Sequence, residues 1–367
     1  MKKAKTLARL TAPGAEPANW SAKSFQPSVK DLPSIPAVNW SAISAQAPQL
    51  LNVSGASLPK SDVIVITWAD PERAAMEHVF SKSGTAMPSS AGNAPSQSGW
   101  TKYAKNLPAA NVSDWSFWGL YRQVRIGGTK VLLFKSNTHL DFPGQQYLTA
   151  MINQLIADAS PSLIMSIGTA GGAQLNDHVG TVRVVHAGTL YENNQPQSDW
   201  PTYVNGWSAN WSIVNSDGFD KLLFPIPTKP ADLQSIASQF NSHYKTSYNL
   251  SDLNPGNLNI GDPTPSLNNM TTGATPLLTA DSFLVATTSG NLDKFACVEM
   301  DDAIIAEACG TNHTAFAFVR NISDPVQNAN LPASAQGNWG HAIYDVYGLY
   351  TSYNGAVTAW ALIASNA

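Results

Sequence analysis

Apolar and polar positions alternate along this chain in two different periods. Short apolar runs with the length and β-branched content of buried strands occur at 63–67, 131–135, 163–167, 181–186, 277–285 and 315–319. Helical patterns lie between them, in a helix that begins at Asp70 and at 143–158, 230–244, 303–309 and 343–363. Strands that alternate with helices in this way predict a layered α/β domain whose sheet is mostly parallel.

Two segments lack this alternation. Residues 1–58 are rich in Pro, Ala and Ser, and they repeat Asn-Trp-Ser-Ala at 19–22 and 39–42. We interpret them as an N-terminal extension whose tryptophans hold an arm against the main domain or a partner subunit. Residues 190–275 are predicted to be a loop-rich insertion, because so long a stretch of loop is usually functional or an added lobe. The main domain is then 59–367.

Composition narrows the classes of protein. Charged residues are 13% of the 367, the net charge is −4, and the Lys and Arg residues are scattered, so we expect neither nucleic acid nor an anionic membrane as a partner. No apolar run is long enough to span a bilayer, and the N-terminus is a poor signal peptide, which favours a cytoplasmic location. The two cysteines are then expected to be reduced.

Acidic residues gather where two predicted elements meet. The stretch Ala-Cys-Val-Glu-Met-Asp-Asp-Ala at 296–303 leads into a short predicted helix. The apolar run at 315–319 is followed directly by Arg-Asn-Ile-Ser-Asp at 320–324. Polar residues at the carboxyl end of a buried strand lie where open α/β sheets bind ligands. Carboxylates from Asp301 and Asp324 in one pocket would suit a hydroxyl-rich substrate with a protonatable leaving group.

Three motifs, taken in this order, resemble the purine nucleoside/uridine phosphorylase superfamily. They are Gly-Thr-Ala-Gly-Gly at 168–172 followed by Val-Gly at 179–180, Val-Glu-Met-Asp at 298–301, and Arg-Asn-Ile-Ser-Asp at 320–324. The chain looks most similar to the nucleosidase branch, typified by methylthioadenosine/S-adenosylhomocysteine nucleosidase, over roughly 60–190 and 275–365. The resemblance implies a three-layer α/β/α nucleoside phosphorylase-like fold with a mixed central sheet, in which 59–367 is the catalytic domain.

The resemblance also implies a reaction, cleavage of the N-glycosidic bond between a purine and ribose. The transition state resembles an oxocarbenium ion, so the enzyme must stabilise positive charge on the sugar and negative charge on the base. By position, Asp324 is the acid that lets the base leave neutral, and Ser323 and Arg320 orient it. Asp301 would hold the ribose hydroxyls, with Met300 packed beneath the sugar.

The sequence departs from the family at the sugar site. The family usually has Glu at the position of Asp301, which is shorter by one methylene, so either the ribose sits deeper or Glu299 or Asp302 helps. Phe283 matches the residue whose ring stacks on the base. A structural role remains an alternative for these residues. A Phe after a strand more often belongs to the core, and Asp301 or Asp302 can simply cap the helix.

Glu72 and Ser166 bear on whether water or phosphate attacks the sugar. Glu72 falls where the nucleosidase branch carries the Glu that activates water, although the helix macrodipole equally favours a Glu in a first turn. Phosphorylases tend to carry an Arg at the position of Ser166, and a serine cannot make the charge-assisted, bidentate bonds that phosphate prefers. Hydrolysis is therefore preferred, with Glu72 as the base.

The glycine-rich motif is interpreted as a loop whose backbone N–H groups could hold an anion or the attacking water. Its candidate substrate-binding residues are Thr169, Ala170 and Gly171. Two alternatives to hydrolysis remain: a phosphorylase that uses inorganic phosphate as co-substrate, and a non-catalytic nucleoside-binding module.

No metal or cofactor is predicted. His139, His178 and His186 have no metal-ligand spacing with one another or with the cysteines. The expected partners are a small-molecule nucleoside and, as the resemblance implies, further copies of the chain in a homo-oligomer.

Overall fold

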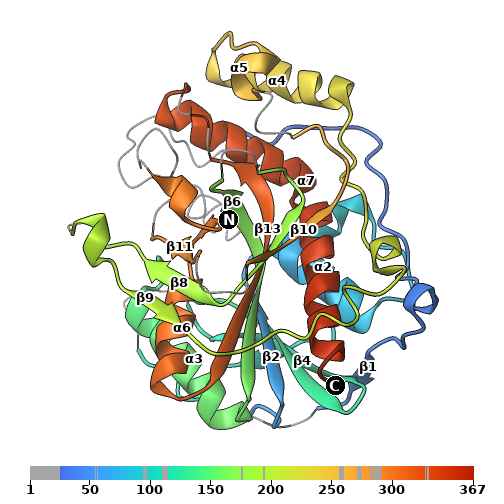
Figure 1. The fold of residues 1–367 in the computed structure, drawn as a ribbon, viewed down its shortest axis with the longest axis vertical. Helices are drawn as coiled ribbons and strands as arrows, with labels where there is room; N and C mark the ends of the chain where they lie inside the picture. Colours follow the sequence, from blue (N-terminus) through green and yellow to red (C-terminus); the bar gives the residue numbers. More distant parts are fainter. Residues whose placement is uncertain are drawn as a thin grey trace.

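The central sheet of this protein is mixed, with helices on both faces (Figure 1). The computed structural model describes residues 25–53, 55, 57–93, 97–109, 115–174, 177–192, 195–255, 260–270, 275–281, 284, 291–326, 328 and 330–367. The predicted three-layer α/β/α arrangement with a mixed central sheet is confirmed.

The strands of the sheet run β1-β4-β5-β2-β6-β12-β11-β8-β9, with β13 also paired to β6 and β7, β3 to β4 and β10 to β7. Their bounds are Gln49–Leu51 (β1), Val63–Thr67 (β2), Thr101–Tyr103 (β3), Gly119–Ile126 (β4), Thr129–Ser136 (β5), Leu163–Gly172 (β6), Thr181–Val185 (β7), Ala187–Leu190 (β8), Thr202–Val204 (β9), Ser266–Met270 (β10), Leu277–Thr279 (β11), Val298–Glu299 (β12) and Ala315–Pro325 (β13). The pairs β5·β2, β2·β6 and β6·β13 are parallel, so their carboxyl ends meet at one edge of the domain.

Two pairs of helices cover the two faces of the sheet, α2 with α7 and α3 with α6 (Figure 1). The helices are Asp70–Ser81 (α2), Gln145–Ala159 (α3), Pro230–Tyr244 (α4), Leu250–Leu253 (α5), Asp302–Thr311 (α6) and Ala333–Ala364 (α7), with short 3-10 helices at Trp40–Ile43, Ser89–Asn93, Gln197–Asp199, Phe219–Lys221 and Leu292–Lys294. None of these described helices combines the length with the apolar character that a membrane span requires.

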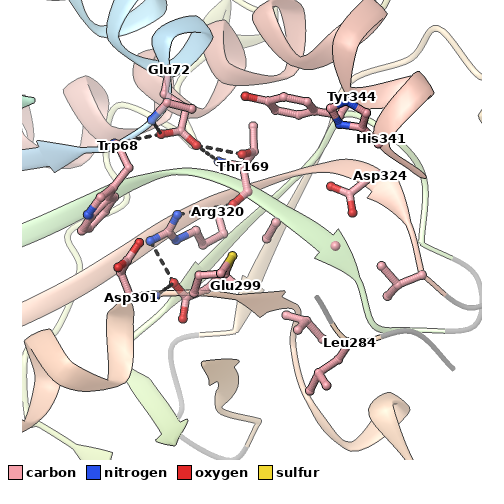
Figure 2. Close-up of a pocket in the computed structure, with 16 residues that line it drawn as sticks. Trp68, Glu72, Thr169, Leu284, Glu299, Asp301, Arg320, Asp324, His341 and Tyr344 are labelled. Atoms are coloured by element: carbon pink, nitrogen blue, oxygen red, sulfur yellow. Dashed lines mark hydrogen bonds and ion pairs between the residues drawn. The ribbon is translucent and has the colours of Figure 1, made fainter. Parts of the chain in front are cut away.

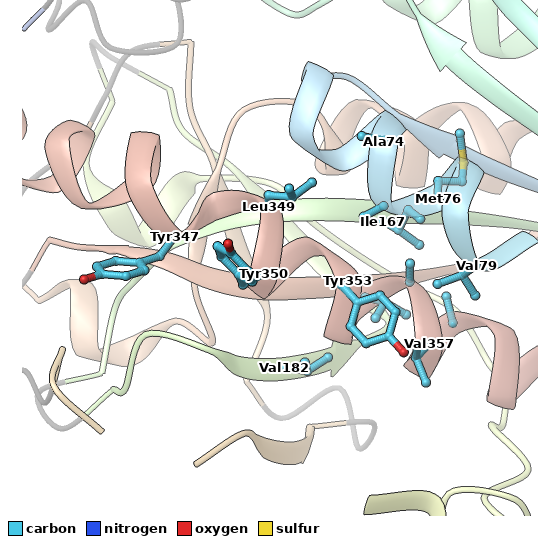
Figure 3. Close-up of a cluster of buried hydrophobic side chains, with 14 of the residues drawn as sticks. Ala74, Met76, Val79, Ile167, Val182, Tyr347, Leu349, Tyr350, Tyr353 and Val357 are labelled. Carbon is cyan, nitrogen blue, oxygen red and sulfur yellow. The ribbon is translucent and has the colours of Figure 1, made fainter. Parts of the chain in front are cut away.

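The long helix α7 lies against the sheet because its aromatic residues recur at helical spacing. Tyr347, Tyr350 and Tyr353 are buried in one apolar cluster with Val79 of α2 and Val182 of β7 (Figure 3). Two of the buried phenols find backbone acceptors: Tyr350 donates to Pro33 O at 2.7 Å, and Tyr353 donates to Leu222 O at 2.8 Å. This packing fixes the start of α7 over the carboxyl ends of the parallel strands.

Two strands are longer than the apolar pattern predicts, and the difference corrects the interpretation of the glycine-rich motif. β6 continues through Gly172, and β13 continues through Pro325, because residues 168–172 and 320–325 pair with each other in parallel. The predicted loop is therefore wrong. The glycines belong to a central strand, so most of their backbone groups are used in the sheet and do not form a free cradle for an anion.

Parts of the predicted N-terminal extension and of the predicted insertion pack onto the main domain. β1 pairs with β4 at one edge of the sheet, and Trp40 is buried against Trp360 of α7, with ring centroids 4.3 Å apart. Trp20, the second tryptophan of the repeat, lies outside the described residues. The predicted insertion at 190–275 contains the strands β9 and β10 and the helices α4 and α5.

Candidate functional site

A pocket opens where β2, β6 and β13 end, between α2 and the first turns of α7 (Figure 2). The space within it is about 780 Å³ when the solvent at its open mouth is included. The residues that line it are Trp68, Ala69, Glu72, Thr169, Ala170, Gly171, Leu284, Val298, Glu299, Met300, Asp301, Arg320, Asp324, Val326, His341 and Tyr344.

Glu72 enters the pocket from the first turn of α2 and is 4% exposed. Its Oε2 accepts hydrogen bonds from Thr67 Oγ1 at 2.8 Å, Trp68 N at 3.0 Å and Ala69 N at 2.7 Å. Its Oε1 accepts from Thr169 N at 2.8 Å and Thr169 Oγ1 at 2.7 Å. The side chain therefore caps its own helix and joins it to β6, so its carboxylate is held in one orientation.

These donors also determine the charge of Glu72. Burial raises the pKa of this carboxyl, but the positive charge of Arg320 and the hydrogen bonds from Thr169 and Ala69 outweigh burial, so its pKa lies below the ordinary 4.5. Glu72 is therefore ionised at neutral pH.

Arg320 is the centre of a buried charge cluster. Its guanidinium binds both oxygens of Asp302, with Nε 2.7 Å from Oδ2, and it also donates to Ser166 Oγ at 2.8 Å and to Glu299 Oε2 at 3.2 Å. The ring of Trp68 lies over it at 5.3 Å. Arg320 therefore does not orient Asp324 as predicted; it neutralises other carboxylates, and Ser166 contributes a hydroxyl to hold it.

Asp301 is fixed by the chain that follows β5. Its Oδ1 accepts from Leu140 N at 2.9 Å, and its Oδ2 lies 3.4 Å from His139 Nδ1. Neither Asp301 nor Asp302 caps α6 with its side chain. Glu299 does so instead, because it accepts the backbone N–H of Asp301 at 2.7 Å and of Asp302 at 3.0 Å. This leaves the Asp301 carboxylate on the pocket wall.

Asp324 accepts far fewer hydrogen bonds than Glu72 does. Ser323 Oγ donates to its Oδ1 at 2.7 Å, while its buried Oδ2 has no hydrogen-bond partner among the described residues. Burial raises the pKa of Asp324 to about 6, although the Ser323 hydrogen bond acts in the other direction. The pairing of β13 with β6 shifts between Ile322 and Asp324, and a bulge of this kind turns a side chain at the end of a strand.

Two glycines of β6 are required by the close approach of pocket side chains. A Cβ on Gly168 would lie 2.7 Å from both Arg320 Nη1 and Glu72 Oε1. A Cβ on Gly171 would lie 2.6 Å from a methyl of Val326. The glycine spacing of the motif therefore serves to let charged and apolar side chains cross the strand.

Nearly all of the residues predicted from sequence come together here. Those that line the pocket are Glu72, Thr169, Ala170, Gly171, Glu299, Met300, Asp301, Arg320 and Asp324. Ser323 lies behind the wall, fully buried, and holds Asp324. Phe283 falls outside the described residues.

Sequence reasoning missed Trp68, His341 and Tyr344, which also line the pocket. Trp68 directly follows a predicted strand, and that position was a usable signal. His341 and Tyr344 carried no signal, because a polar aromatic pair in an aromatic-rich helix looks the same whether it faces the core or a cavity. Among the residues that the structure describes, no three or more His, Cys, Asp or Glu are arranged to hold a metal ion.

Comparisons with known proteins find similarity only at the level of structure. No protein-family model matches the chain, and no curated protein does. The 5′-methylthioadenosine/S-adenosylhomocysteine nucleosidase of Neisseria meningitidis, solved with methylthio-immucillin-A, is similar with 12% identity and a TM-score of 0.44, over 83% of this chain and 99% of that one. Futalosine hydrolase of Helicobacter pylori is similar with 12% identity and a TM-score of 0.43, over 83% and 97%.

Proposed function

We propose that this protein hydrolyses the N-glycosidic bond of a purine ribonucleoside. The observation that supports the proposal is a pair of carboxyl groups in one pocket whose protonation is driven in opposite directions. Hydrogen bonds and Arg320 keep Glu72 ionised, whereas burial raises the pKa of Asp324 to about 6. Two titratable groups separated in this way are suited to act as base and acid in one reaction.

In the proposed reaction, water attacks C1′ of the ribose as the bond from C1′ to the base nitrogen breaks. The electron pair of that bond goes to the base, and protonated Asp324 donates its proton to a ring nitrogen, so the base leaves neutral. Glu72 accepts a proton from the water. The Thr169 hydroxyl can rotate, so the water can replace it as a donor to Oε1 of Glu72. Asp324 regains its proton from solvent and Glu72 releases one.

The charge around the pocket suits a sugar that becomes positive. Glu72, Glu299, Asp301 and Asp302 surround a single guanidinium, that of Arg320. Burial, and then the charge of Asp302, raise the pKa of Glu299, so this crowded cluster retains a proton. The remaining negative charge would stabilise an oxocarbenium-like sugar more than the neutral substrate. Asp301, which lines the pocket, would bind the ribose hydroxyls, as the motif implies.

The same charges oppose phosphate as the attacking group. Arg320 is the one Lys or Arg among the described lining residues, and its donors already bind Asp302, Ser166 and Glu299. An incoming phosphate would meet carboxylates without a free cation to bind it. We therefore favour water over phosphate, and the proposed reaction needs no cofactor.

The test is incubation of the protein with a panel of purine and pyrimidine ribonucleosides, with and without inorganic phosphate, followed by chromatography. We expect free purine and ribose at a rate that added phosphate does not change. Ribose 1-phosphate and a requirement for phosphate would instead identify a phosphorylase.

Glu72→Gln should lower base release by about 100- to 10,000-fold, because a neutral amide cannot accept the proton of water. Glu307→Gln, the same change on α6 at a residue that does not line the pocket, is the matched control and should keep full activity. If nucleosides bind but neither the parent protein nor the control releases a base, the protein is a binding module.

A further inference from the structure

One wall of the pocket carries buried polar atoms that form no hydrogen bond with the residues that the structure describes. His341 and Tyr344 enter the pocket from the N-terminal part of α7, and we refer to these two side chains as the α7 wall (Figure 2). Both nitrogens of His341 and the hydroxyl of Tyr344 are buried and have no hydrogen-bond partner among the described residues. Buried polar atoms are normally satisfied, so such atoms on a pocket wall can form hydrogen bonds to a molecule that enters the pocket.

The two rings form a fixed unit beside the proposed catalytic residues. They stack with centroids 6.3 Å apart and an angle of 23° between their planes. His341 Nε2 lies 3.4 Å from Asp345 Oδ2 in the next turn of α7. In Figure 2 the Tyr344 hydroxyl points toward Glu72 and Thr169, and the His341 ring lies above Asp324. A ligand between Glu72 and Asp324 would therefore contact this wall.

The α7 wall is uncharged at neutral pH. Burial lowers the pKa of His341 to about 4, so its imidazole is neutral and has one donor and one acceptor nitrogen. Burial, with the nearby charges of Glu72 and Asp345, raises the pKa of the Tyr344 phenol well above 10, so it keeps its proton. Such a wall matches a neutral group that both donates and accepts hydrogen bonds, since a phosphate or carboxylate would meet no cation there.

Polar aromatic side chains elsewhere on α7 differ from the α7 wall in their position relative to the pocket. Tyr350 and Tyr353, which lie further along the helix, donate their hydroxyls to backbone carbonyls at 2.7 and 2.8 Å. They belong to the apolar cluster of Figure 3 and do not line the pocket. The hydroxyl of Tyr347, on the same helix, is buried without a hydrogen-bond partner among the described residues but does not line the pocket, so position on the pocket wall is what distinguishes His341 and Tyr344.

We propose that the α7 wall binds an uncharged hydrogen-bonding substituent of the nucleoside and selects against substrates that are apolar at that point. This inference rests on the proposed function and adds a specificity element to the same pocket. Two parts of a nucleoside have this chemistry, the 5′-hydroxyl of the sugar and the exocyclic group of the base. A site built to hydrogen-bond a substituent rejects the analogue that lacks it, because its own polar groups are then buried unpaired.

The experiment measures kcat/KM and, by calorimetry, Kd for adenosine, 5′-deoxyadenosine and purine riboside, which lacks the 6-amino group. We expect the wild-type protein to prefer adenosine to one of the two analogues by about tenfold. Tyr344→Phe and His341→Phe should reduce that preference to about twofold or less. The analogue that shows the effect identifies the source: 5′-deoxyadenosine indicates the sugar hydroxyl, and purine riboside indicates the base.

Tyr347→Phe is the matched control, because it removes a hydroxyl from the same helix at a residue that does not line the pocket. It should leave both preferences unchanged. The proposal is overturned if Tyr344→Phe and His341→Phe behave as this control does, or if the wild-type protein treats all three nucleosides alike. If no base is released from any of them, hydrolysis is refuted and the Kd ratios alone decide the role of the wall. If none of the three binds, both proposals fail.

Discussion

Asp324→Asn separates a catalytic acid from a structural aspartate, because the two roles predict opposite effects on stability and activity. Asn has nearly the same shape and can still accept the Ser323 hydrogen bond that Asp324 accepts at 2.7 Å. It has no proton to transfer to the leaving base. If Asp324 protonates the base, base release should fall by about 100- to 10,000-fold.

The expected gain in stability follows from the pKa of Asp324. Burial raises this pKa from its ordinary 3.8 to about 6, so the folded protein binds the proton more tightly than the unfolded chain does. The cost of ionising the buried carboxyl therefore appears as the pH rises from about 4 and is complete above about 6. It reaches up to about 3 kcal/mol at pH 8, at 1.36 kcal/mol per pH unit. Asn carries no such cost.

Urea unfolding at several pH values, together with base-release assays, measures both effects. We expect Asp324→Asn to be more stable than the wild-type protein by about 1–3 kcal/mol at pH 8, with the difference falling toward zero near pH 4. Asp293→Asn, at an exposed residue in the 3-10 helix Leu292–Lys294, is the control and should change neither quantity. Loss of stability at every pH with activity retained would refute both the buried-acid reasoning and the catalytic role.

Two further predictions concern the groups that hold these carboxylates. Arg320→Met should lower the free energy of unfolding by about 3–5 kcal/mol in urea, because Asp302 and Glu299 would be left buried without a cation. A decrease of less than about 1 kcal/mol would show that these two acids are already neutral in the folded protein. Ser323→Ala should raise the pKa of Asp324 further, since it removes the hydrogen bond that lowers it. The alkaline limb of the pH profile of kcat/KM should then move to higher pH, and a move to lower pH would contradict this reading of the acid.

The sequence by itself determined most of the layers and most of the chemistry. The apolar runs and helical periods predicted the α/β class, since a buried strand and a one-faced helix leave period signals that need no knowledge of their partners. The motifs likewise predicted the residues of the pocket, from Glu72 on α2 to Asp324 on β13, although these residues lie 252 positions apart in a 367-residue chain.

Only the tertiary structure decided which residues pair with which. The sequence predicts a loop at Gly168. This residue belongs to β6 instead, because pairing with β13 extends the strand beyond its apolar run. Arg320 was predicted to orient Asp324, but it binds Asp302, which α6 brings beside it. His341 and Tyr344 were not found at all. Hydrogen bonds and burial depend on contacts between distant segments, and such contacts leave no pattern in the local sequence. The position of the α7 wall in the pocket therefore follows only from the packing of α7 against the strand ends.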